Sequence, residues 1–188
     1  MNIIVRPYGS DLCYCRPDTT WERENRDLYS PECVNEWHWA PILFARISKA
    51  GKCISPKFVS RYYDAVNFGA LLYCNPEMGI AFASCADHTS LLPAPLYNPA
   101  VMGNADNRFE VNREGATIYS VDCNETNGLT ALLEDSICKA SQLTSLRIGD
   151  FVAVELATPA ILANRQDGEV ELKADFCNNR TFDFKIIF

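Results

Sequence analysis

Histidine is scarce in this 188-residue sequence, where His38 and His88 are the only two. So few histidines leave little material for a His-rich metal site or a Ser-His-Asp triad. No run of about 18 apolar residues occurs, so the sequence predicts no membrane-spanning helix. No basic cluster offsets the formal net charge of −7. We therefore expect neither nucleic acid nor an anionic membrane as a partner, because both require a positive field.

An export signal is also missing from the first residues. Met1–Val5 is followed at once by Arg6, without the apolar segment of a signal peptide. We therefore expect a cytoplasmic protein. Cysteine, by contrast, is abundant, with nine residues scattered along the chain. Only Cys13 and Cys15 approach the spacing of zinc ligands, so we expect most cysteines to be free, buried and hydrophobic in role.

The most apolar strand candidate ends the segment Arg61–Cys74. Phe68–Cys74 carries apolar residues at successive positions, which is typical of a strand buried on both faces. Gly69 inside it indicates a bulge or a close backbone approach. Further buried strands are predicted at residues 2–5, 42–47, 79–84 and 151–156, and half-buried alternating strands at 116–121, 170–176 and 182–188.

One segment shows clear helical periodicity. Apolar residues recur at three- and four-residue intervals from Leu129 to Ala140, which predicts a helix over about 129–144, with Asn127 or Thr130 as its N-cap. Residues 16–39 are polar and aromatic without a period. We expect a single domain over 1–188, with residues 1–40 as an irregular segment packed on it. The predicted fold class is α+β, mainly β, ending in a β-hairpin.

The order of several short motifs resembles a known family. The helix leads into Thr144-Ser-Leu-Arg-Ile-Gly-Asp150, Thr158-Pro159 follows, and the chain ends with Phe182-Asp-Phe-Lys-Ile186. This order is similar to the C-terminal-type domain of the fumarylacetoacetate hydrolase family, in its short single-domain form. Weaker upstream matches are colinear with it, at Pro41–Phe44 with Arg46, Gly79–Phe82 and Asn98–Gly103. The resemblance implies a mixed, twisted β-roll that is commonly dimeric.

The same resemblance implies a metal site that this sequence lacks. Active members hold Mg²⁺ or Mn²⁺ through a Glu-x-Glu on one strand and an Asp on the next, and they cleave or decarboxylate β-dicarbonyl acids. A hard cation prefers such oxygen ligands. Glu-x-Glu falls on Gly69 and Leu71, and Asp falls on Ala81, none of which can ligate a metal through its side chain. The family's arginine, lysine and first histidine are also missing, at or near Cys85, Ala94 and Cys13.

Two functions follow from these losses. The first is a pseudoenzyme that keeps the scaffold for binding or assembly, without a cofactor, as a homodimer with a small carboxylic or oxo-acid as ligand. The alternative is an active hydrolase, isomerase or decarboxylase of small oxo-acids with a rebuilt site, with Mg²⁺ or Mn²⁺ as its cofactor. Candidate catalytic residues for the alternative are His88, Asp87, Arg46 and Thr158.

Two further possibilities use other side chains. Arg46 and Arg61 could hold a carboxylate in a bidentate manner, although ordinary surface arginines explain them as well. Cys85 or Cys74 could act as a nucleophile, which requires a nearby base such as His88 to form a thiolate. The simpler role for both cysteines is core packing.

Overall fold

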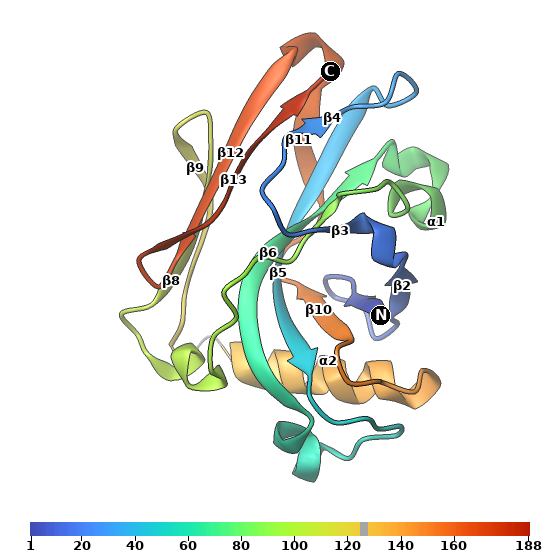
Figure 1. The fold of residues 1–188 in the computed structure, drawn as a ribbon, viewed down its shortest axis with the longest axis vertical. Coiled ribbons are helices and arrows are strands. Elements are labelled where there is room, and N and C mark those ends of the chain that lie inside the picture. Colours follow the sequence, from blue (N-terminus) through green and yellow to red (C-terminus); the bar gives the residue numbers. More distant parts are fainter. Residues whose placement is uncertain (125–127) are drawn as a thin grey trace.

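The computed structural model describes residues 1–124 and 128–188, which form two curled β-sheets with one long helix across an end (Figure 1). The first sheet has the order β2-β1-β10-β5-β6-β7-β3, with β11 also paired to β5. The second has the order β4-β13-β12-β8-β9. The predicted α+β, mainly β class with mixed, twisted sheets is therefore confirmed.

The strands of the first sheet are β1 (Ile3–Arg6), β2 (Tyr14–Arg16), β3 (Trp21–Glu22), β5 (Glu36–Ile47), β6 (Tyr63–Cys74), β7 (Ser90–Leu91), β10 (Phe151–Glu155) and β11 (Ala160–Asn164). Those of the second are β4 (Leu28–Tyr29), β8 (Arg108–Arg113), β9 (Ala116–Asp122), β12 (Glu169–Phe176) and β13 (Asn179–Ile187). The helices are α1 (Ile80–Ala83) and α2 (Leu129–Leu143), with 3₁₀ turns at Asp18–Thr20, Pro56–Arg61, Pro76–Met78, Pro99–Gly103 and Arg165–Asp167.

The long antiparallel pair β5–β6 forms the centre of the first sheet. Their register runs from Trp37 opposite Cys74 to Ile47 opposite Tyr63. Side chains on one face join a large core with α2 and the second sheet, and those on the other face join a smaller apolar core. The prediction of a strand buried on both faces is confirmed.

Aromatic stacking joins the two sheets across the larger core. Phe68 of β6 stacks on Phe109 of β8, with ring centroids 4.8 Å apart, and meets Phe176 of β12 edge-on at 4.8 Å. Aromatic pairs of this kind add about 0.5–1.5 kcal/mol to the burial of their surface. The second sheet is therefore held directly against β6.

The predicted helix and C-terminal hairpin are confirmed. Helix α2 begins after Gly128, which has a φ of 62°, and buries the expected apolar stripe. Thr130 lies inside the helix rather than at its cap, and Asn127 lies outside the described residues. In the hairpin, β12 and β13 are antiparallel, and alternate residues such as Val170 and Phe184 are buried.

Two local predictions are wrong. Within the expected strand at 79–84, Ile80–Ala83 form helix α1 instead, because Asn75 and Gly79, with φ of 41° and 92°, turn the chain sharply after β6. Strand β5 begins at Glu36 rather than Ile42. Pro41 is tolerated inside it because β11 pairs with β5 only up to Trp39 and β10 only from Ile42, so no ladder partner requires an N–H from the proline. Its carbonyl oxygen accepts the backbone N–H of Leu156 at 2.8 Å.

The N-terminal segment contains more strands than its irregular composition suggests. Between residues 16 and 39, β3 pairs with β7 in the first sheet and β4 pairs with β13 in the second. Each is two residues long, so its partner rather than its own sequence specifies it. Trp37, at the start of β5, is fully buried in the larger core.

The cysteines are free, as expected, but not uniformly buried. Cys74, Cys123 and Cys138 are buried, whereas Cys15, Cys33, Cys53 and Cys85 are exposed. Core packing therefore explains only part of the cysteine content. Within the described residues, no helix is long and apolar enough to cross a membrane.

Candidate functional site

The face of β6 that carries Gly69 and Leu71 is the face on which the metal-binding carboxylates were expected. Leu71 is fully buried, in an apolar core with Ile42 and Phe44 of β5. A Cβ atom built on Gly69 would overlap the carbonyl oxygen of Leu91 and lie 3.3 Å from Cδ of Pro93. A backbone segment therefore rests directly on Gly69, in the space that a longer side chain would need.

Asn67, on the same face, fastens this covering segment. Its Nδ2 donates hydrogen bonds to the carbonyl oxygens of Pro93 and Pro95, at 3.4 and 3.0 Å, while its Oδ1 accepts from the backbone N–H of Phe68 at 2.7 Å. Asn67 is 1% exposed, so these bonds are shielded from water. No sequence pattern indicates this role, because the acceptors lie nearly thirty residues further along the chain.

Several polar groups that remain on this face bond to one another, although Nε and Nη1 of buried Arg16 have no hydrogen-bond partner among the described residues. Tyr73 donates a hydrogen bond to buried Glu155, its hydroxyl lies 2.8 Å from that of Tyr14, and Glu155 also accepts from the backbone N–H of Tyr8. Burial raises the pKa of the Glu155 carboxyl and of the Tyr73 hydroxyl. The guanidinium of Arg16 lies over the Tyr73 ring, 5.1 Å from its centroid.

These residues do not fit a hard divalent cation. Mg²⁺ and Mn²⁺ require several oxygen ligands, whereas this face offers aliphatic side chains, one occupied carboxylate and a buried arginine. In the described part of the chain, no group of three His, Cys, Asp or Glu side chains is placed to hold a metal ion. The third expected position, Ala81, lies exposed on α1, and β7 rather than that segment pairs with Ala70 and Leu71.

The remaining candidate residues do not gather at one site. Arg46 is exposed and makes an ion pair with Asp64 at 3.0 Å. Arg61 lies over the ring of Phe58, and Thr158 is exposed in the turn between β10 and β11. Asp87 and His88 are the two that share a cavity.

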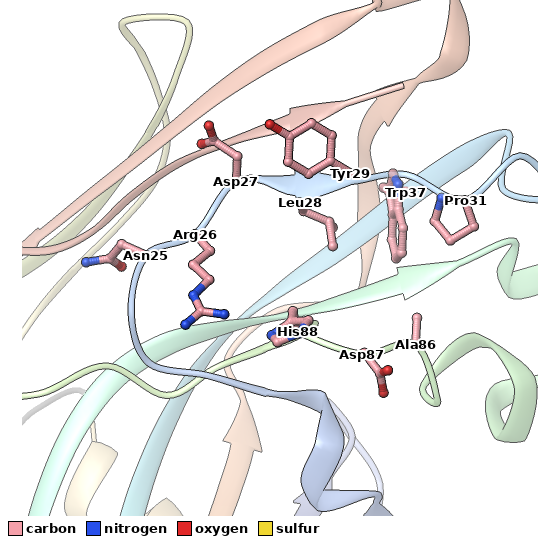
Figure 2. Close-up of a pocket in the computed structure, with 10 residues that line it drawn as sticks. All are labelled: Asn25, Arg26, Asp27, Leu28, Tyr29, Pro31, Trp37, Ala86, Asp87 and His88. Atoms are coloured by element: carbon pink, nitrogen blue, oxygen red, sulfur yellow. The ribbon is translucent and has the colours of Figure 1, made fainter.

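That cavity has a volume of about 780 Å³ and lies between the β4 segment and the turn after α1. Its lining consists of Asn25, Arg26, Asp27, Leu28, Tyr29, Pro31, Trp37, Ala86, Asp87 and His88 (Figure 2). Trp37 belongs to the larger core, so the cavity is on the opposite side of β5 from the Leu71 face. It is therefore separate from the expected metal position.

A buried glutamate that sequence reasoning missed orients His88. Glu22 of β3 has a 4% exposed side chain, and its Oε2 lies 2.8 Å from Nδ1 of His88. Its Oε1 accepts the backbone N–H of Glu24 at 2.6 Å. Because Glu22 holds Nδ1, the free nitrogen of the His88 ring is Nε2.

The cysteine candidates lack a thiolate environment. Burial raises the pKa of the Cys74 thiol, which disfavours its reactive form. Cys85 is exposed, and its Sγ donates to the carbonyl oxygen of Ala81 at 2.7 Å. His88 is paired with Glu22 rather than with Cys85.

Comparison of the structure with solved structures identifies the fold. A protein from Yersinia pestis CO92 provisionally assigned to the fumarylacetoacetate hydrolase family matches with a TM-score of 0.76, 16% identity, and coverage of 99% of this chain and 92% of the other. The chain has the fumarylacetoacetate hydrolase fold. No family model and no curated protein matches the sequence.

Enzymes share this fold at similarly low identity. Fumarylpyruvate hydrolase from Pseudomonas aeruginosa, solved with Mn²⁺ and pyruvate, matches with a TM-score of 0.78 and 14% identity, covering 100% of this chain and 90% of that one. The 5-carboxymethyl-2-hydroxymuconate delta-isomerase from Mycobacterium smegmatis matches with a TM-score of 0.79 and 11% identity, covering 99% and 78%. These neighbours are hydrolases and isomerases, and identities this low establish the fold alone.

Because backbone lies directly on Gly69, adding a single methyl group at this position should lower the stability of the fold strongly. Gly69→Ala should lower the free energy of unfolding by about 1–3 kcal/mol, because the covering backbone must move. Gly103→Ala is the control, since no heavy atom lies within 4 Å of its Cβ position, and it should change stability by less than about 0.5 kcal/mol. Urea unfolding followed by tryptophan fluorescence measures both, and equal effects of the two substitutions would contradict the packing at Gly69.

The buried carboxyl of Glu155 predicts a pH-dependent stability. Burial raises the pKa of this carboxyl above the ordinary value of 4.5. The stabilisation that the protonated carboxyl gives to the folded state is therefore fully present below pH 4.5 and is lost as pH rises through the raised pKa. In Glu155→Gln, stability should fall less between about pH 4.5 and 7 than in the wild type. Unfolding in urea at several pH values tests this, with exposed Glu77→Gln as control. An unchanged pH dependence in Glu155→Gln would show that the carboxyl does not contribute.

Proposed function

We propose that this chain is a metal-independent binding protein on the fumarylacetoacetate hydrolase fold, without the metal-dependent chemistry of that fold. The packing of Leu91 and Pro93 on Gly69 carries this proposal. A carboxylate at that position would need the space that the backbone occupies, and Leu71 beside it lies in a dry apolar core. The expected ligand class is a small carboxylic or oxo-acid.

Two features support the proposal that restoring a metal site would require more than new carboxylates. The covering segment is fixed by the two hydrogen bonds from Asn67, so it cannot move without leaving a buried amide unpaired, at a cost of about 1–3 kcal/mol. The buried cation of Arg16 lies close by and would repel a second positive charge. The homodimer implied by the family resemblance stays a prediction.

An acid–base enzyme is the second candidate, favoured by the pairing of buried Glu22 with His88. A carboxylate that holds one imidazole nitrogen while the other faces a cavity is an arrangement typical of a general base. Turnover of acylpyruvates or oxaloacetate that is lost in His88→Asn and kept in His38→Asn would support this candidate. Equal turnover in both variants would exclude His88 from the role.

Metal binding provides the direct test of the proposed function. After treatment with EDTA and dialysis, the protein should leave added Mn²⁺ free in solution, because no described cluster of oxygen ligands is available to it. Electron paramagnetic resonance of free Mn²⁺ and titration calorimetry measure this. Asp87→Asn is the control for weak surface binding near the cavity.

A stoichiometric Mn²⁺ site with a micromolar dissociation constant that persists in Asp87→Asn would contradict the proposal. Weak binding that disappears in Asp87→Asn would agree with it, because that carboxylate lies on the cavity rim and not on the Leu71 face.

A further inference from the structure

Two basic side chains line the cavity beside β4 and come from different segments. Arg26 belongs to the segment before β4, and His88 belongs to the turn after α1. In Figure 2, Arg26 extends toward His88, while the carboxylate of Asp27 and the ring of Tyr29 lie on the other side of β4. Basic groups from two segments thus meet across one cavity.

Arg26 retains the capacity to bind an anion. Its Nε and Nη2 donate to Glu24, but both side chains are exposed, by 65% and 63%, and such pairs contribute about 0–1 kcal/mol. Its Nη1 has no hydrogen-bond partner among residues 1–124 and 128–188. A carboxylate could therefore take Nη1 directly and compete with Glu24 for the rest of the guanidinium.

His88 is held in place by contacts on both its backbone and its ring. Its backbone φ is 60°, a conformation that an L residue adopts at a steric cost. Its N–H donates to the carbonyl oxygen of Thr19 at 3.3 Å, and Glu22 holds Nδ1 at 2.8 Å. In the protonated ring Nε2–H is a donor, and Glu22 balances the charge.

The cavity wall between these groups is apolar. Leu28 and Trp37 are buried, and Pro31 and Ala86 complete the wall. The Trp37 ring is fixed by a hydrogen bond from Nε1 to Oγ of Ser30 at 3.0 Å. A rigid apolar wall favours a flat hydrocarbon body.

The acidic residues of the lining do not oppose an anion between Arg26 and His88. Oδ1 of Asp27 accepts the backbone N–H of Lys185 at 2.9 Å, which ties this side chain to β13. The carboxylate of Asp87 points away from Arg26 (Figure 2).

We infer that this cavity binds a small aromatic carboxylate, with its carboxylate between Arg26 and His88 and its ring against Leu28, Pro31 and Ala86. This inference rests on the proposed metal-independent binding role and gives it a site on the opposite side of β5 from the filled metal position. Glu22 is a positioning residue, because it acts on the ligand only through His88.

The experiment titrates the EDTA-treated full chain with phenylacetate and follows the imidazole Hε1 signals by proton NMR. The chain has two histidines, and His88→Asn assigns the signals while preserving a residue that tolerates a positive φ. Phenylacetate should shift the His88 signal in a saturable manner and leave His38 unmoved. Phenylacetamide, which lacks the charge, and acetate, which lacks the ring, should each bind at least fivefold more weakly.

Matched variants separate the site from general surface effects. Arg26→Ala and His88→Asn should weaken phenylacetate binding at least fivefold, with the loss in His88→Asn followed on the ligand signals. Arg23→Ala and His38→Asn should not change it, because Arg23 lies over Trp21 and His38 pairs with Glu36 at 2.5 Å, both outside the cavity. Glu24→Gln should strengthen binding, because it frees Arg26.

Equal binding of phenylacetamide, equal weakening by the control variants, or the absence of a saturable shift of His88 would each overturn the inference. These outcomes are distinguishable from failure of the proposed function, because phenylacetate binding is measured on the EDTA-treated chain. The proposed function is tested separately, by Mn²⁺ binding. A micromolar Mn²⁺ site would contradict the proposed function whatever phenylacetate does. The absence of phenylacetate binding, with Mn²⁺ left free, would overturn the cavity assignment alone.

Discussion

The ladder between β5 and β6 is buried on both faces along most of its length, and much of the molecule is arranged to cover it. On one side, α2 and the second sheet pack against it through contacts such as the stack of Phe68 on Phe109. On the other side lie β1, β10 and the residues that follow β7. Apart from residues near the strand ends, such as Arg46 and Asp64, the side chains of these two strands must therefore suit an interior, and that requirement limits the chemistry they can perform.

The requirement explains why the expected metal position became part of the core. Carboxylates buried there would be stable only with a cation or water to compensate them. Gly69 and Leu71 need neither, and they allow the chain after β7 to lie directly on the sheet. The polar atoms left on that face, such as those of Tyr73 and Glu155, bond to one another instead of to a ligand. The cavity with converging basic side chains lies on the other side of β5, where Trp37 forms part of its wall.

The sequence predicted the parts of the fold that depend on periodicity. The α2 stripe and the alternation of β12 and β13 are regular over eight residues or more, so they indicate both the element and its buried face. Residues 79–84 were misassigned because a short, largely apolar run fits a short helix as well as a strand. The pairing of Glu22 with His88 had no signal, since the residues lie 66 positions apart and β3 is specified by β7. His88 and Asp87, predicted as candidate catalytic residues, line one cavity, whereas the sequence did not point to Glu22 or Arg26 beside them.

The placement of β1 has a consequence for how the chain reaches this structure. Ile3 pairs in parallel with Phe151, and Leu28 of β4 pairs with Ile186 near the end of the chain. Neither sheet can be completed until almost the whole chain has been synthesised, and such long-range pairings form slowly. Until then the apolar strands β5 and β6 lack their cover on both faces, and exposed strands of this kind associate with one another. A nascent or truncated chain should therefore depend on chaperones far more than its length alone would suggest.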